Sequence, residues 1–164
     1  MILSDDYFMK QALSEAKTAF EKGEVPIGAV IVCEGKIIAR AHNLTETLND
    51  VTAHAEMQAI TAAAAVLGGK YLIDCILYVT IEPCPMCAGA LAWAQIGQIV
   101  YGSGDEKRGF TKLTPGILHP KTKVKSGVMA EESTQLMKEF FKGMRSWRTE
   151  GLKDNLAEIH EVLN

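Results

Sequence analysis

The sequence lacks any long apolar run: no stretch approaches the roughly 18–20 consecutive apolar residues that a membrane-spanning helix requires. Residues 1–10 include two aspartates and do not show the basic-then-apolar order of a secretory signal peptide. Internal repeats are also missing. We therefore expect a cytoplasmic protein with no membrane partner, and we predict no signal peptide.

Cysteine is sparse, with Cys33, Cys75, Cys84 and Cys87 among 164 residues. In a cytoplasmic chain these are better explained as free thiols or metal ligands than as disulfides. Hydrophobic residues make up 48% of the sequence, which is enough to build the core of one domain of this length. The chain therefore needs neither disulfides nor a metal merely to stay folded.

An excess of positive charge is missing too, since the formal net charge is −3, which by itself argues against nucleic acid. The charge is unevenly distributed, however. Residues 1–104 carry a net −5, residues 105–148 a net +5 and residues 149–164 a net −3. The positive block is either a surface that faces phosphates or an ordinary solvated loop and helix face.

Apolar periodicity and turn residues predict alternating helices and strands, and hence a mixed sheet with helices on its faces. Ser4 is the expected N-cap of the first helix, which ends at Gly23. Residues 146–164 show only a weak helical pattern and form either an appended helix or a ragged tail. The other predicted helices span 54–67, 85–94 and 130–145, the strands span 27–33, 36–41, 76–81, 98–101 and 123–128, and 103–122 is an irregular loop.

Three metal-ligand side chains stand where predicted helices begin. Cys84 and Cys87 are three residues apart after a strand, so both thiols can point at one cation, and the helix N-terminus favours their thiolate form. His54 opens another helix. These three ligands leave one position of a tetrahedral zinc ion open for water, as in catalytic rather than structural sites. Cys33 and Cys75 lie alone in or beside strands, where we expect small buried residues.

Glu56 lies two residues after His54, within the same first helical turn. From there it can reach a water on the metal and act as a general acid–base group. Each residue alone has an ordinary explanation: a carboxylate favoured by the helix dipole for Glu56, a capping or core histidine for His54, and a redox or structural pair for the cysteines. Their combination at this spacing favours a catalytic zinc site.

His-x-Glu followed by Pro-Cys-x-x-Cys is the signature of the zinc-dependent nucleobase deaminases. The resemblance covers roughly residues 5–145, and in detail the sequence looks like the bacterial tRNA-specific adenosine deaminase family. The segments that carry it are Val25–Val30, Asn43, Thr52–Glu56, Leu77–Cys84, Cys87–Ala90, Ile96–Gly97, Val100–Gly102 and Asp105-x-Lys107-x-Gly109.

This resemblance implies a three-layer α/β/α sandwich with a five-stranded mixed sheet, of the cytidine-deaminase-like kind. It also implies Zn²⁺ as cofactor, a homodimer, a tRNA anticodon stem-loop as partner, and conversion of adenosine to inosine at the wobble position. Residues 1–145 would form the deaminase domain and 146–164 a C-terminal extension of unknown role. The implied site comprises the catalytic Glu56, the metal ligands His54, Cys84 and Cys87, and the substrate-binding residues Asn43, Ile27, Gly28 and Ala55.

Asn43 carries a donor and an acceptor and follows a predicted strand, so it suits the reading of a base edge; its alternative is a turn residue. Six basic residues are candidates for RNA contact, and the last three share one helical face; their alternative is a solvated surface. The six are Lys107, Arg108, Lys112, Lys138, Lys142 and Arg145.

Two departures from the family leave a second function open. Pro85 stands between the cysteines and, with Trp93-Ala94, resembles the guanine deaminases; residues 110–113 replace a usual stretch of small residues. A deaminase of a free base or nucleoside, of guanine or cytosine type, is therefore the alternative, and the net negative charge suits it. A non-catalytic zinc module is a third hypothesis, against which Glu56 argues.

Overall fold

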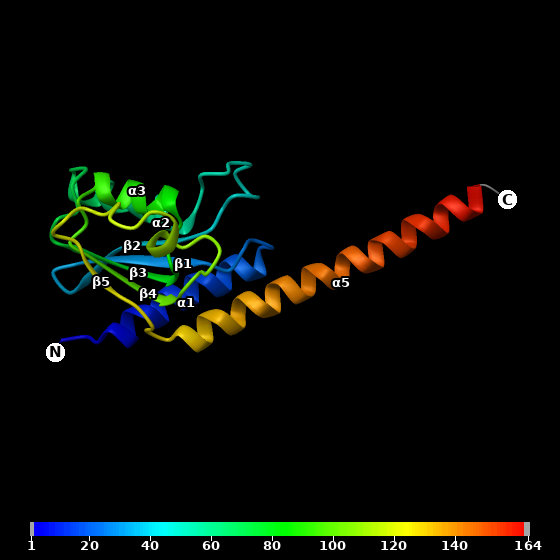
Figure 1. Ribbon diagram of the computed structural model, residues 1–164, viewed down its shortest axis with the longest axis horizontal. Coiled ribbons are helices and arrows are strands. Elements are labelled where there is room, and N and C mark those ends of the chain that lie inside the picture. Colours follow the sequence, from blue (N-terminus) through cyan, green and yellow to red (C-terminus); the bar gives the residue numbers. More distant parts are fainter. Residues whose placement is uncertain (1, 163–164) are drawn as a thin grey trace.

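A five-stranded sheet lies between two layers of helices in the computed structural model, which describes residues 2–162 (Figure 1). The strand order is β2-β1-β3-β4-β5. In chain order the elements are α1 (Asp5–Glu21), β1 (Gly28–Cys33), β2 (Lys36–His42), α2 (Ala55–Leu67), β3 (Cys75–Ile81), α3 (Pro85–Trp93), β4 (Gln98–Ser103), α4 (Phe110–Leu113), β5 (Lys123–Lys125) and α5 (Ala130–Val162).

The sheet is mixed because its two halves are connected differently. β1 runs antiparallel to β2 and to β3, and the β1–β2 hairpin closes through Glu34 and Gly35, both with positive φ, as tight hairpins of right-handed twist require. β3, β4 and β5 are parallel, and α3 supplies the crossover that β3 and β4 need. The predicted fold class is confirmed.

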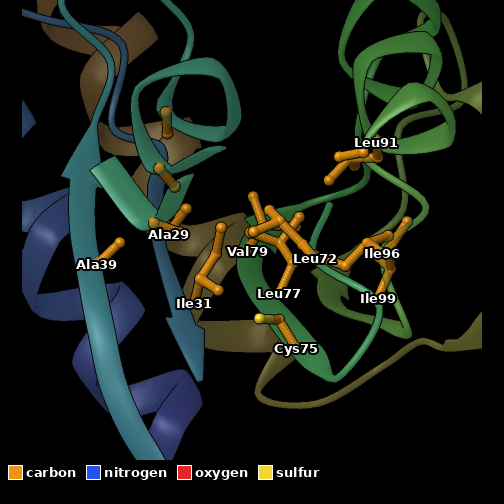
Figure 2. Close-up of a cluster of buried hydrophobic side chains, with 14 of the residues drawn as sticks. Ala29, Ile31, Ala39, Leu72, Cys75, Leu77, Val79, Leu91, Ile96 and Ile99 are labelled. Carbon is orange, nitrogen blue, oxygen red and sulfur yellow. The ribbon is translucent and has the colours of Figure 1, made fainter. Parts of the chain in front are cut away.

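The side chains of each strand pack into two separate cores, because successive residues of a strand point to opposite faces of the sheet. On one face Ile31 and Leu77 pack under α2 and α3 together with Leu91 (Figure 2). On the other face Val30 packs with Met9 of α1. Helices α2 and α3 thus cover one side of the sheet, and α1 and the start of α5 cover the other (Figure 1).

Helix ends place the chemistry-bearing residues. The hydroxyl of Ser4 accepts the Tyr7 N–H at 3.2 Å, so the predicted cap of α1 is confirmed. His54 is the N-cap residue of α2 and Cys84 that of α3, where Pro85 occupies the first turn, a position that tolerates its missing N–H. The sequence therefore delivers a histidine and a thiol to two neighbouring helix N-termini.

Three predictions of where helices and strands lie along the chain were wrong. The region 103–122, expected to be irregular, contains α4, because the Phe110 side chain is buried and its N–H donates to the Pro83 carbonyl at 3.0 Å. β5 stops at Lys125 rather than at 128. The last helix does not end near 145 but continues as α5 to Val162; residues 163–164 lie outside the described part. Within residues 2–162, no helix is long and apolar enough to cross a membrane.

Candidate active site

Three donor atoms from two helix starts converge on one point. His54 Nδ1 lies 3.6 Å from Cys84 Sγ and 3.5 Å from Cys87 Sγ, and all three atoms lie within 4.8 Å of one another. A tetrahedral zinc ion, with Zn–S about 2.3 Å and Zn–N about 2.0–2.1 Å, would hold such N and S atoms about 3.5 Å apart. The donor set and its spacing therefore fit Zn²⁺.

The electrostatics of the cluster favour a thiolate. Hydrogen bonding from the Cys87 thiol, followed by that from His54, lowers the pKa of Cys84 to about 4. The same contact with Cys84 raises the pKa of Cys87 and raises that of His54. Cys84 is thus anionic at neutral pH, the form in which cysteine binds a metal.

Glu56 stands in the first turn of α2 with only 4% of its surface exposed. Burial raises the pKa of its carboxyl group, and the negative charge of Cys84 acts in the same direction. A carboxyl group whose pKa is raised holds a proton more readily than an ordinary carboxylate, which suits a group that must both accept and release one. The arrangement can therefore activate a water and protonate a leaving group.

Two backbone hydrogen bonds hold Asn43 and the residue after it close to the start of α2. Its N–H donates to the Ile27 carbonyl at 3.1 Å, and the next residue, Leu44, donates to the Ala53 carbonyl at 2.9 Å. Asn43 and Ile27 are therefore neighbours, and the loop that begins at Asn43 is closed immediately before His54.

Gly28 and Ala55 are held by close packing. A Cβ atom on Gly28 would stand 2.0 Å from the Ala12 carbonyl oxygen of α1, so the contact with α1 requires glycine at this position. The Gly28 N–H donates to the Thr80 hydroxyl at 3.2 Å. Ala55 is fully buried as the first residue of α2.

The basic candidates fall into two groups, and all six are exposed. Lys107 and Arg108 lie in a turn whose N–H groups both donate to Asp105 Oδ1 at 3.0 Å. This turn lies close to the Cys84 end of the cluster, because the N–H of Phe110, two residues after Arg108, donates to the carbonyl of Pro83, the residue before Cys84, at 3.0 Å. The positive charge of Arg108 partly opposes the net rise in the pKa of His54. Lys112 forms an ion pair with Glu106.

The second basic group lies elsewhere. Lys138, Lys142 and Arg145 are on α5, which packs on the α1 side of the sheet, whereas the metal ligands begin the helices of the other side (Figure 1). The structure therefore does not bring these three residues to the cluster.

Sequence reasoning missed two buried carboxylates. Glu24 accepts hydrogen bonds from the segment 43–47, and Glu82 accepts from the Thr111 N–H at 3.3 Å and its hydroxyl at 3.2 Å. A signal was available for Glu82, which follows a largely apolar strand and directly precedes Pro83; Glu24 follows the charged residues Glu21 and Lys22 and carries no such signal.

Comparison with known proteins gives concordant matches. The profile of the MafB19-like deaminases matches residues 3–145. A tRNA-specific adenosine deaminase of Aquifex aeolicus (strain VF5) is 48% identical over 149 residues, which span 88% of this chain and 98% of that protein. A structure from studies of A-to-I editing by tRNA:A34 deaminases is 45% identical, with a TM-score of 0.75 over 79% of this chain and 98% of that one. A guanine deaminase structure from Bacillus subtilis is also 45% identical, with a TM-score of 0.60 over 62% and 66%.

Proposed function

Because this chain belongs to the MafB19-like deaminases and to the tRNA-specific adenosine deaminase family, we propose that it hydrolyses adenosine to inosine at the wobble position of a tRNA anticodon. The observation that carries the chemistry is the convergence of His54 Nδ1 and the sulfurs of Cys84 and Cys87 beside the buried Glu56. Near-complete coverage of the tRNA-specific relative supports the choice of substrate.

His54, Cys84 and Cys87 would hold Zn²⁺, which when bound makes water a nucleophile at neutral pH. Glu56 takes a proton from the attacking water and delivers it to a ring nitrogen of the base. It then takes the remaining proton of that water and passes it to the amino group that leaves C6, so that adenosine and water give inosine and ammonia. Asn43, with Ile27, Gly28 and Ala55 around it, forms the proposed substrate-binding site.

RNA binding requires a local positive surface because the chain as a whole is negative. A base must be extruded to reach a buried site, so the protein must hold the flanking backbone. Lys107, Arg108 and Lys112 suit this role because the Phe110 N–H donates to the Pro83 carbonyl, which holds this segment beside Cys84. Lys138, Lys142 and Arg145 would contact a more distant part of the RNA.

The assembly expected from the family is a homodimer, and exposed apolar side chains support it. The Leu72 N–H donates to the Ala94 carbonyl at 2.8 Å, which brings Tyr71 and Ile73 close to Trp93, 85% of which is exposed. Apolar groups gathered in this way suit burial by a second copy.

A cytoplasmic location belongs to the same proposal. So does the division into a deaminase domain (1–145) and an extension (146–164), although α5 runs through that boundary unbroken.

A free-base deaminase is the second candidate because the guanine deaminase of Bacillus subtilis is 45% identical over its matched part. One assay separates the two functions. The purified protein is incubated with an anticodon stem-loop carrying adenosine at the wobble position, with free adenosine and with free guanine, and the products are identified by mass spectrometry. Inosine in the stem-loop alone supports the proposal; brisk turnover of guanine with an untouched stem-loop overturns it.

The basic surface is tested by reversing charges. Lys107→Glu, Arg108→Glu and Lys142→Glu together are expected to weaken stem-loop binding by about tenfold or more and to flatten its salt dependence, since each lost phosphate contact reduces counterion release. The matched control reverses three exposed lysines elsewhere in the chain, Lys10 on α1, Lys36 on β2 and Lys70 in the loop after α2. Equal weakening by both triple variants would show that only net charge matters.

A further inference from the structure

Glu24 is a fully buried acid whose carboxylate is bound by one short segment. Its Oε1 accepts the Thr47 N–H at 2.6 Å and the Thr47 hydroxyl at 2.8 Å. Its Oε2 accepts the Glu46 N–H at 3.2 Å and the Asn43 side-chain amide at 3.3 Å. All four donors come from residues 43–47, and no salt bridge reaches Glu24 in the described part of the chain.

The carboxylate is ionised in the folded protein. Burial alone would raise the pKa of Glu24, but the hydrogen bonds from Thr47 and Glu46 outweigh it, so its pKa lies below the ordinary glutamate value. A buried charge of this kind is tolerated only when its hydrogen bonds are made. The segment 43–47 is therefore held against Glu24 by a strong and specific requirement.

This requirement also orients the Asn43 side chain. An amide can face a carboxylate only through its nitrogen, because its carbonyl oxygen would be repelled. Asn43 Nδ2 indeed bonds to Glu24, and also lies 3.2 Å from the Thr45 hydroxyl, so the carbonyl oxygen is turned away from Glu24. The backbone of the same residue is fixed to Ile27, and its neighbour Leu44 to Ala53, next to the metal ligand His54.

We propose that Glu24 is a positioning residue of the active site: its carboxylate fixes the amide of Asn43, and the loop that follows, in the orientation that receives the substrate base. The inference rests on the proposed function because it takes Asn43 as the residue that contacts the base. Glu24 acts through Asn43 on substrate binding and takes no part in proton transfer, which belongs to Glu56.

A double-mutant cycle tests this role on the full-length, zinc-loaded protein. Glu24→Gln keeps the side-chain size but cannot accept all four hydrogen bonds, and Asn43→Ala removes the amide. Each is expected to lower kcat/KM for the stem-loop about tenfold or more, mainly through KM, with zinc retained, as when a partner of a buried charged group is lost. Because both act through one amide, the double variant should be within about twofold of the worse single variant.

Glu82→Gln is the matched control. Glu82 is also a buried carboxylate beside the site, but it binds Thr111 and not Asn43. Its fold-loss should multiply with that of Asn43→Ala, as expected for independent residues. Multiplying losses in the Glu24–Asn43 cycle would overturn the proposal. So would a lower melting temperature of Glu24→Gln with kcat/KM unchanged within about twofold, since that describes a purely structural residue.

Two further measurements keep the test decisive. If Glu24→Gln does not fold, Thr47→Val removes one of the four donors and should show the same coupling at about threefold. The side-chain amide resonances of Asn43 in a ¹H–¹⁵N spectrum should shift in Glu24→Gln, and unshifted resonances would contradict the proposal whether or not the protein is active. If the wild type deaminates guanine instead of the stem-loop, the proposed function fails, and the same cycle run with guanine still tests Glu24.

Discussion

The two ends of strand β3 carry similar residues and have opposite chemistry. Its carboxyl end leads to Cys84 and Cys87, which meet His54. Its amino end begins with Cys75, which lies directly opposite Cys33 of β1. A cavity of about 500 Å³ adjoins this amino end and is lined by Cys75 and by residues that include Asp74, His119 and Lys121. At each end of β3, therefore, two cysteines lie close together and a histidine lies near at least one of the two.

Backbone environment makes the difference between the two pairs. Cys84 occupies the N-cap position of α3, and hydrogen bonds from the Cys87 thiol and from His54, aided by the exposed N–H groups of the helix start, lower its pKa to about 4. Cys75 is buried in a strand, so burial, reinforced by Cys33, raises its pKa to about 12. Two neighbouring cysteines are therefore not enough to make a metal site. The pair at the carboxyl end can bind a metal because it lies at a helix N-terminus and faces a histidine.

The largest effect should come from removing Glu56, the proposed acid–base group. Glu56→Ala is expected to lower turnover by at least about 10²–10⁴-fold, the usual contribution of such a group, while zinc content and melting temperature stay near wild type. Glu131→Ala, at an exposed position on α5, is the control. Turnover of Glu56→Ala within about tenfold of wild type would place proton transfer elsewhere.

Metal content compares the two cysteine pairs directly. Cys84→Ser should lose zinc and activity, because a hydroxyl is a much poorer ligand than a thiolate, whereas a Cys33→Ser, Cys75→Ser double variant should keep about one zinc per chain. Elemental analysis of dialysed protein measures both. If the double variant loses its zinc, the metal binds at the amino end of β3, and the assignment to His54, Cys84 and Cys87 is wrong.

The smallest effect concerns alkaline pH at the amino end. The folded state keeps Cys75 neutral, whereas the unfolded chain ionises it above its ordinary pKa near 9. The stability contributed by this thiol is therefore complete below pH 9 and is lost as pH rises toward 12, by about 1 kcal/mol per pH unit. Urea unfolding at pH 8–10 should show a shallower decline for Cys75→Ala than for wild type. An identical decline would mean that Cys75 ionises freely.

Local signals in the sequence sufficed for much of this structure. Ser4 and Gly68 mark helix ends by their cap chemistry, and the spacing of Cys84 and Cys87 after a strand was enough to group them with His54. What depends on distant contacts could not be foreseen. α4 exists because Phe110 is buried and bonded to Pro83, and Glu24 has a role only because a segment about twenty residues later folds over it.

The extent of α5 was missed for a different reason. No proline interrupts residues 130–162, and its glycines lower helix propensity without ending a helix. The weak apolar pattern after residue 145 reflects a helix that continues beyond the body of the protein (Figure 1).

The pairing of β1 with β3 divides the chain into two locally connected halves. Paired residues of β1 and β2 are 3 to 14 positions apart and those of β3 and β4 are 22 apart, whereas the β1–β3 seam joins residues about 45 positions apart. Such long-range pairing carries a loop-closure cost and tends to form late in folding. His54 belongs to the first half and the two thiols to the second, so a cation bound between them would cross-link two segments that only long-range pairing brings together, coupling metal uptake to folding.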